Sequence, residues 1–357
     1  MAPRIVFVHG VGGLREPARE LAGWTEALAL GCREAGHSRF ARQLREGAAN
    51  VVFAYYGDLF YKPQAQGDEF LDLDDHAAEL LHAFLADLLI EQLRDQPSDR
   101  SSDRSSDQPS PEDADPGRPA LDAETVRLLK RARSQLSPTG QQQGSGEILR
   151  HTFNAVTTLL AIRPLRKAGQ WTLSKTMVGH LSQVARYLAR GEADTAGRTL
   201  DVRARERVAD ALKADSAVVV AHSLGSVVAW EALHEADTPV PLFVTLGSPL
   251  ATRSVVWPHL RPPPPSTPEC VGRWLNFWDR DDFVVARPRL EKDIRPNAAG
   301  VVPRSKRVDS DGLWVHSAVK YLRQARVAGR IAEIAEYGPD AAGADRADRT
   351  HGADSAD

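Results

Sequence analysis

The chain contains only two cysteines among its 357 residues, Cys32 and Cys270. Two thiols are too few for a disulfide framework or a cysteine-rich metal cluster, and they suit a reducing compartment. Long apolar runs are also missing. A membrane-spanning helix requires about 18 consecutive uncharged apolar residues, and no such stretch occurs. The N-terminus lacks the apolar segment of a signal peptide. We therefore expect a cytoplasmic protein.

The chain also has no large excess of positive or negative charge. The 45 lysines and arginines nearly balance 48 acidic residues, for a formal net charge of −3. This balance argues against nucleic acid as the partner, because no overall basic field is present. The spacings of histidine, cysteine and aspartate do not suit a zinc site, so we expect no metal. Hydrophobic residues make up 42% of the chain, which predicts a folded globular protein with a large core.

The stretch at residues 217–226 carries the most information about function. Four apolar residues, mostly β-branched, run into a turn that contains Ser223, and a helical pattern follows. Small residues, Ala221 and Gly225, stand two positions before and two after the serine, as a tight strand-to-helix turn requires. The pattern predicts a nucleophile elbow, which exposes a serine hydroxyl at the tip of such a turn. An ordinary turn that happens to contain a serine is the alternative.

A glycine-rich loop, HGVGG at residues 9–13, follows the first predicted strand at residues 5–8. Glycines let backbone N–H groups turn toward a negatively charged group. The loop resembles a phosphate cradle, but the third glycine of a dinucleotide motif would fall on Arg15, and no P-loop lysine follows. We favour an oxyanion loop over a phosphate cradle or a plain tight turn.

Carboxylates crowd the end of a further predicted strand, residues 274–278. Asp279, Asp281 and Asp282 lie together there, and His316 stands later in the chain at a turn before a predicted helix. A serine hydroxyl needs a base to take its proton, and the base needs one carboxylate to orient it. The ends of parallel strands converge on one edge of a sheet, where we expect these groups to meet. The competing bases are His9, His222 and His259.

Residues 58–200 are too long to be a loop in a compact α/β unit. We expect them to form a helical insertion, a cap or lid, with helices over residues 74–94 and 121–136. A Ser/Asp/Arg-rich segment at about residues 96–118 can bury almost nothing and is predicted to be disordered. The C-terminal tail, residues 338–357, is rich in alanine, aspartate and glycine and is also predicted to be disordered.

Residues 147–190 combine an apolar helical stripe with Arg163, Arg166 and Lys167. This combination is typical of a lid over an apolar pocket or of a peripheral membrane contact. Apolar helix stripes also simply pack on a core. The sequence leaves these three interpretations open.

Together these motifs resemble the α/β-hydrolase superfamily, closest to its lipase and esterase branch. The matching segments are residues 8–13, 221–225, 245–249, 274–284 and 315–316. The resemblance implies an α/β fold with a mostly parallel central sheet and helices on both faces. Residues 1–57 and 201–337 would form this hydrolase core, and the insertion between them matches no part of the family that we can name.

The resemblance also implies a role for individual residues. Ser223 would be the nucleophile and His316 the general base and then the general acid. Asp282 would orient the histidine, with Asp279 as the alternative acid and Asp281 as the third choice. Family members often have proline directly after this acid, where the present chain has phenylalanine.

The oxyanion hole would use the backbone N–H of Leu224 and that of Val11 or its neighbour. The implied activity is a lipase- or esterase-like serine hydrolase that cleaves a small-molecule or lipid ester, or a thioester, through an acyl-enzyme and without a cofactor. A serine peptidase or amidase is an alternative, because the same groups cleave both bond types. A non-catalytic interaction protein, working through the disordered segment, the prolines at 262–265 and the acidic tail, is another. The sequence does not indicate the oligomeric state.

Overall fold

The computed structural model describes residues 2–12, 15–61, 75–94, 123–136, 151–152, 154–155, 158, 181–253, 255–280, 282, 284–285, 287–310 and 315–338. The strands are β1 (Arg4–Val8), β2 (Val51–Ala54), β3 (Ala217–His222), β4 (Leu242–Leu246), β5 (Trp274–Asp279) and β6 (Pro303–Val308). They form one sheet in the order β2-β1-β3-β4-β5-β6, in which every neighbouring pair is parallel. The predicted α/β architecture with a parallel sheet is confirmed.

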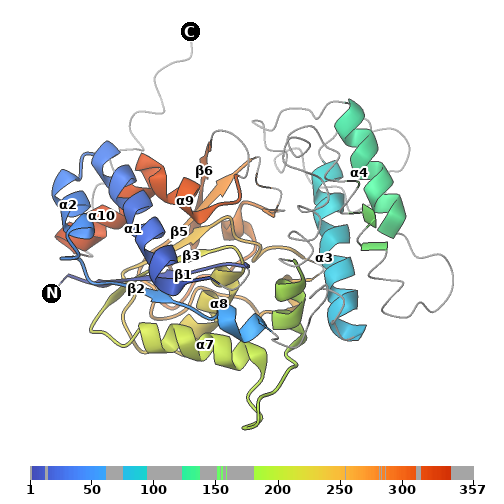
Figure 1. The fold of residues 1–357 in the computed structure, drawn as a ribbon, viewed down its shortest axis with the longest axis horizontal. Helices are drawn as coiled ribbons and strands as arrows, with labels where there is room; N and C mark the ends of the chain where they lie inside the picture. The colour runs from blue at the N-terminus through green and yellow to red at the C-terminus, as the bar shows by residue number, and fades with distance from the viewer. Residues whose placement is uncertain are drawn as a thin grey trace.

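Helices pack on both faces of this sheet (Figure 1). The α-helices of the described residues include α1 (Pro17–Glu34), α2 (Ser38–Arg45), α3 (Asp75–Arg94), α4 (Ala123–Leu136), α7 (Leu200–Ala211), α8 (Leu224–Leu233), α9 (Ala318–Arg323) and α10 (Ala325–Tyr337). Short 3₁₀ helices are η1 (Gly57–Phe60), η6 (Trp257–His259) and η7 (Leu290–Lys292). A further helix covers residues 181–189.

Alternation along β3 explains why the core has two halves. Val218 and Val220 belong to a buried cluster with α1, α2, α9 and α10, whereas Val219 and Ala221 belong to a cluster with α7 and α8. Successive side chains of a strand point to opposite faces of the sheet. A strand that is apolar at every position therefore fits a parallel sheet covered by helices on both sides.

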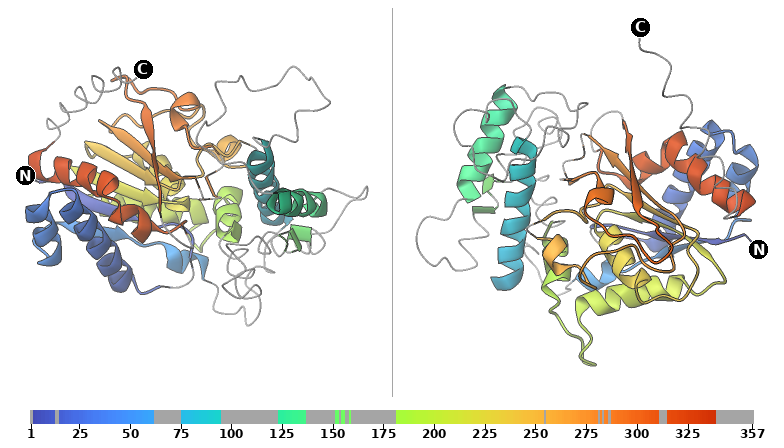
Figure 2. Two further views of the ribbon diagram at one scale, coloured as in Figure 1. Left: turned by 90° about the horizontal axis from the view of Figure 1, so that it is seen from above. Right: turned by 180° about the vertical axis from the view of Figure 1, so that it is seen from behind.

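The described part of residues 58–200 adds helices to the molecule. Helices α3 and α4 lie beside each other at one end, away from α1, α2 and α10 (Figures 1 and 2). Leu81 and Phe84 of α3 belong to the same apolar cluster as the α7–α8 face of the sheet. The segment at 96–118, most of residues 147–190 and residues 339–357 lie outside the described residues. None of the described helices is both long enough and apolar enough to cross a bilayer.

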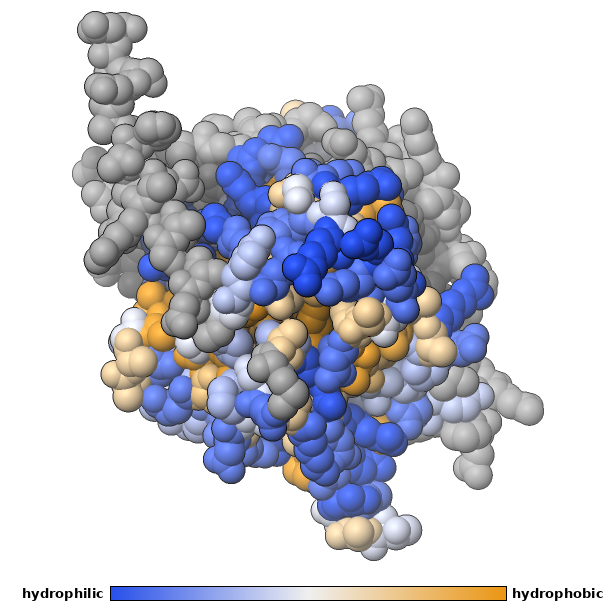
Figure 3. All heavy atoms as spheres, turned by 90° about the vertical axis from the view of Figure 1, so that its left-hand side faces the viewer, coloured by the Kyte–Doolittle hydropathy of each residue, from blue (hydrophilic) through white to orange (hydrophobic). Residues whose placement is uncertain are grey.

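Helix α1 shows the amphipathic pattern that its sequence predicts. Trp24, Leu28 and Cys32 recur at four-residue spacing and are buried against the sheet. The side of the molecule that carries α1, α2 and α10 presents a mostly hydrophilic surface with smaller apolar areas (Figure 3). One face of α1 thus contributes to the core while the other remains toward solvent.

Gly31 of α1 provides a test of this packing. A Cβ atom at Gly31 would lie 2.6 Å from the Leu322 carbonyl oxygen and 2.7 Å from the Ala328 Cβ. We expect Gly31→Ala to lower the free energy of unfolding by about 1–3 kcal/mol, the usual effect of overpacking. Denaturant titration followed by circular dichroism measures the change.

Gly23→Ala is the matched control, because Gly23 lies in the same helix and a Cβ atom there would meet nothing within 4 Å. Its helix propensity should raise the stability by up to about 1 kcal/mol. If Gly31→Ala behaved like Gly23→Ala, the close packing of α1 against α9 and α10 would be wrong.

Candidate active site

Ser223 lies in a sharp turn between the end of β3 and the start of α8. Its backbone has φ 54° and ψ −130°, a conformation that costs a non-glycine residue on the order of 1–3 kcal/mol. The Ser223 N–H donates to the Leu246 carbonyl oxygen at 3.0 Å, and the Ser226 N–H and hydroxyl donate to the Ser223 carbonyl oxygen at 2.9 and 2.6 Å. Bonds on both sides of the serine therefore hold the strained turn.

Two glycines allow the backbone to come close around this turn. A Cβ atom at Gly225 would lie 2.2 Å from the His9 carbonyl oxygen and 2.6 Å from that of Val8. A Cβ atom at Gly10 would lie 2.5 Å from the Ser223 Cβ. Gly225 is thus needed where α8 meets the end of β1.

The structure brings Ser223, His316 and Asp282 into one hydrogen-bonded chain. The His316 Nε2 lies 2.8 Å from the Ser223 Oγ, and the His316 Nδ1 lies 2.7 Å from the Asp282 Oδ2. An ionised carboxylate only accepts hydrogen bonds, so Nδ1 carries the proton and Nε2 of the neutral ring can accept the serine proton. Asp282 and Ser223 are buried, while the His316 side chain is 21% exposed. This arrangement can transfer a proton from the hydroxyl to the imidazole.

Tyr321, in α9, supports the carboxylate and was not singled out from the sequence. Its hydroxyl donates to the Asp282 Oδ2 at 2.8 Å and accepts from the Asp279 N–H at 3.0 Å. Burial, and then the nearby Asp282 carboxylate, raise the pKa of Tyr321 well above its ordinary value, so the phenol remains a donor. The Val284 N–H donates to the other oxygen of Asp282 at 3.1 Å.

The other two carboxylates of the cluster occupy different places. Asp279 is the last residue of β5, and its Oδ2 accepts a hydrogen bond from the Ser310 N–H. Its carbonyl oxygen accepts from the Asp282 N–H at 3.1 Å, which closes the turn that aims Asp282 at the histidine. Asp281 lies outside the described residues. Of the two described carboxylates, Asp282 is the one that contacts His316.

Gly247, directly after β4, makes room for the Asp–His pair. Its φ is +55°, and a Cβ atom there would lie 2.7 Å from the Asp282 Oδ2 and 3.1 Å from the His316 Nδ1. Glycine is required at this position for both its conformation and its lack of a side chain. The hydroxyl of Ser248, the next residue, instead pairs with the Ser226 hydroxyl at 2.7 Å.

Side chains on two sides fix the loop after β1. The Tyr56 N–H donates to the His9 Nε2 at 3.1 Å, so the ring proton is on Nδ1, which donates to the Gly10 carbonyl oxygen at 2.6 Å. The Tyr56 hydroxyl donates to the His9 carbonyl oxygen. Gln183 forms two hydrogen bonds with Gly12. His9 therefore has a structural role in the loop.

The two backbone groups predicted to meet an oxyanion adjoin the same turn. Leu224 is the first residue of α8, so its N–H has no partner within the helix and lies at the positive end of the helix dipole. Val11 follows Gly10, which packs directly on Ser223. Two residues from separate segments, one following Ser223 and one following Gly10, thus adjoin the turn.

The competing histidines are placed differently from His316. The ring centroid of His222 lies 4.6 Å from that of His316, and burial lowers the pKa of His222 well below its ordinary value. Its Nε2 has no hydrogen-bond partner among the described residues. The His259 Nδ1 lies 2.6 Å from the Val255 carbonyl oxygen. Among the described histidines, His316 is the one that hydrogen-bonds to Ser223.

Within the described ranges, no group of three or more histidine, cysteine or acidic side chains could hold a metal ion. Comparisons of the chain with family models, curated proteins and solved structures found no match. The geometry of the site is therefore the basis on which a function can be inferred.

The burial of His9 predicts a loss of stability in acid. Burial lowers the pKa of His9 to about 4, below the value of about 6.5 for an exposed histidine. Between these values the unfolded chain binds a proton that the folded chain excludes. The contribution of neutral His9 is fully present above about pH 6.5 and declines toward pH 4, by roughly 3 kcal/mol in total.

Denaturant unfolding of the wild type and of His9→Gln at pH 7, 5 and 4 measures this decline. Glutamine keeps an acceptor for the Tyr56 N–H but does not titrate. The variant should be less stable at pH 7 and should lose less stability on acidification. Parallel curves for the two proteins would contradict a buried neutral His9.

Proposed function

We propose that this protein is a serine hydrolase that cleaves a carboxylic ester or thioester through an acyl-enzyme. One observation carries the proposal, namely the hydrogen-bonded chain from the Ser223 hydroxyl through His316 to Asp282, at a strained strand-to-helix turn. We also propose that residues 1–57 and 201–337 form an α/β-hydrolase fold, with residues 58–200 as its cap.

In the proposed first step, the Ser223 Oγ attacks the carbonyl carbon of the substrate while the His316 Nε2 takes the hydroxyl proton. Asp282 accepts the Nδ1–H bond and stabilises the imidazolium that forms. The substrate carbonyl oxygen becomes negative and accepts hydrogen bonds from the N–H groups of Leu224 and Val11. Each such donor contributes about 2.7–4 kcal/mol to transition-state stabilisation in measured enzymes.

The remaining steps use the same groups in reverse roles. His316 gives its proton to the departing alcohol or thiol, and the acyl group stays on the Ser223 oxygen. Water then attacks the acyl carbon as His316 takes a water proton. Collapse of this second intermediate releases the carboxylic acid and returns the proton to Ser223. No step requires a cofactor.

The location of the groups supports the proposal. Ser223 follows β3, Gly247 follows β4 and Asp282 follows β5, and these three strands are neighbours in the sheet. In open parallel α/β sheets, ligands bind outside the carboxyl ends of the strands. His316, which hydrogen-bonds to Ser223, is itself partly exposed.

The choice of an ester or thioester substrate rests on the apolar and basic sequence of residues 147–190, which suits an acyl chain or a lipid surface. A serine peptidase or amidase would use the same three side chains. A cytoplasmic location also remains part of the proposal. Parallel assays with short and long acyl esters, an acyl thioester and a peptide anilide distinguish these substrate classes.

Ser223→Ala tests the nucleophile. Hydrolysis of p-nitrophenyl acetate and octanoate should fall by at least about 10³-fold, because the attacking oxygen is removed. A fluorophosphonate probe should label the wild type at Ser223, as located by mass spectrometry. Ser248→Ala is the control and should still be labelled, because the Ser248 hydroxyl pairs with Ser226. Unchanged turnover by Ser223→Ala, or an unlabelled but folded wild type, would contradict the proposal, and the latter would favour a non-catalytic protein.

Asp282→Asn and Asp279→Asn together test which carboxylate orients the base. The first should lower kcat by about 10⁴-fold, since an amide at this position no longer selects the required tautomer of His316. The second should lower kcat far less, because the Asp279 side chain bonds to the Ser310 N–H. Steady-state kinetics on p-nitrophenyl esters measure both. The opposite ranking would show that Asp279 is the acid.

A further inference from the structure

Gln183 holds the loop after β1 from a position 171 residues further along the chain. The Gly12 N–H donates to the Gln183 Oε1 at 2.9 Å, and the Gln183 Nε2 donates to the Gly12 carbonyl oxygen at 2.7 Å. The side-chain amide thus pairs with Gly12 in the way that a residue of an antiparallel strand exchanges two bonds with its partner. Two opposed hydrogen bonds fix the rotation of this backbone segment as well as its distance.

One of these two bonds removes the Gly12 N–H from the groups of the loop that could face the serine. The Gly12 N–H is occupied by Gln183. Gly10 lies against Ser223, since a Cβ atom at Gly10 would be 2.5 Å from the Ser223 Cβ. Between them, the Val11 N–H makes no hydrogen bond to any described residue. Of Val11 and the residue that follows it, Val11 is therefore the one with an available donor.

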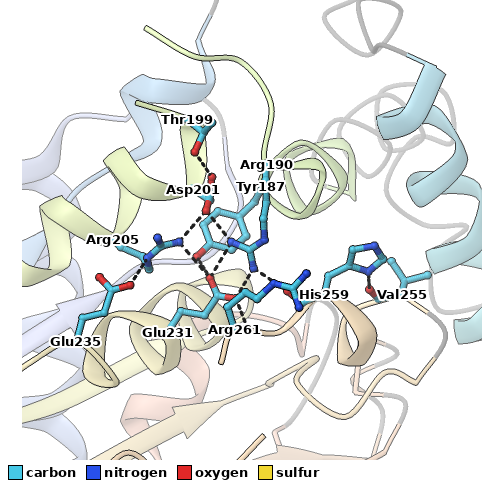
Figure 4. Close-up of polar contacts among 10 residues, drawn as sticks. All are labelled: Tyr187, Arg190, Thr199, Asp201, Arg205, Glu231, Glu235, Val255, His259 and Arg261. Atoms are coloured by element: carbon cyan, nitrogen blue, oxygen red, sulfur yellow. Dashed lines mark hydrogen bonds and ion pairs between the residues drawn. The ribbon is translucent and has the colours of Figure 1, made fainter. Parts of the chain in front are cut away.

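The helix that carries Gln183 is fixed to the helix that follows Ser223. Gln183 and Tyr187 stand four residues apart in this helix, on the same side of it, and Arg190 directly follows its last residue with a φ of 52°. The Tyr187 hydroxyl donates to the Glu231 Oε2 at 2.7 Å, and the Arg190 Nη2 donates to the Glu231 Oε1 at 2.6 Å. Glu231 belongs to α8 and is buried. Figure 4 shows Tyr187 and Arg190 converging on this carboxylate.

Further ion pairs complete the attachment. Asp201 of α7 accepts hydrogen bonds from Arg190 and Arg205 at 2.6 and 2.7 Å (Figure 4). The buried carboxylates of Glu231 and Asp201 are thus paired with the same two guanidinium groups. Leaving a buried charge unpaired is strongly destabilising. The helix at 181–189 therefore has a defined position relative to α8.

We propose that Gln183 is a positioning residue for the oxyanion hole. The Leu224 N–H belongs to α8, and the Val11 N–H belongs to the loop after β1. The helix at 181–189 is attached to α8, and Gln183 of that helix bonds to the loop. Gln183 therefore fixes the distance between the two N–H donors. This inference rests on the proposed hydrolase activity. Gln183 acts through Val11, so its loss should affect kcat more than KM, because the charge that the donors stabilise develops only in the transition state.

Gln183→Met tests the role, because methionine keeps the length of the side chain and removes both hydrogen bonds. Complete loss of one oxyanion donor lowers kcat by about 10²–10³-fold in measured enzymes. For a displaced donor we expect kcat for p-nitrophenyl acetate to fall by about tenfold or more, with KM unchanged within about twofold. Amide hydrogen exchange in residues 9–12 should become faster, which provides a readout independent of activity.

Thr238→Val is the matched control. It removes one side-chain hydrogen bond to backbone, from the Thr238 Oγ1 to the Leu212 carbonyl oxygen, near the start of β3 and β4. This variant should keep the wild-type kcat and the wild-type exchange rate in residues 9–12. If Gln183→Met does not fold, Gln183→Glu replaces it, since a carboxylate accepts from the Gly12 N–H but donates nothing to the Gly12 carbonyl.

The outcomes distinguish a failure of this inference from a failure of the proposed function. A wild type labelled at Ser223 by a fluorophosphonate, together with a Gln183 variant of wild-type kcat, would overturn the role of Gln183 alone. An equal loss of kcat in Thr238→Val would also overturn it, because the effect would then follow general destabilisation. A wild type that is folded, unlabelled and inactive would overturn both the hydrolase and the positioning role.

Discussion

The strained backbone of Ser223 is the constraint on which the rest of the site depends. A φ of 54° is unfavourable for serine. Hydrogen bonds and close packing on either side of the turn hold the backbone in this conformation. The N–H of Ser223 bonds to the end of β4, and the close approach of α8 to the end of β1 admits no side chain at Gly225. The parallel register of β1, β3 and β4 thus determines where the hydroxyl lies.

Burial determines how the histidines around this turn differ. His9 and His222 are enclosed, and burial lowers the pKa of both, so they are neutral near pH 7. His316 comes from the segment before α9, is partly exposed and spans the distance between a hydroxyl and a carboxylate. His9 therefore supports the loop, His222 packs in the buried interior and His316 is the candidate base. Their contact with water and with acidic side chains makes the difference.

Much of the sheet could be predicted from the sequence, because β1, β3, β4 and β5 are apolar at nearly every position, as strands covered on both faces must be. Strand β6 could not, because its run of arginine, serine and lysine belongs to an edge strand with partly exposed side chains. The predicted C-terminal helix is interrupted at Gln324, whose extended backbone divides α9 from α10. The motifs suggested Ser223, Asp282 and His316, but Tyr321 and Gln183 act through tertiary contacts that no local pattern encodes.

The carboxylate of Glu231 has a consequence for how the molecule loses its structure. It accepts hydrogen bonds from Tyr187 and Arg190, from Arg205 of α7 and from the Arg261 N–H, so three separate segments meet on one buried charge of α8. Detaching any one segment would leave that charge incompletely compensated. These segments should therefore open together as a single cooperative unit, and partial unfolding that frees only one of them should be scarcely populated.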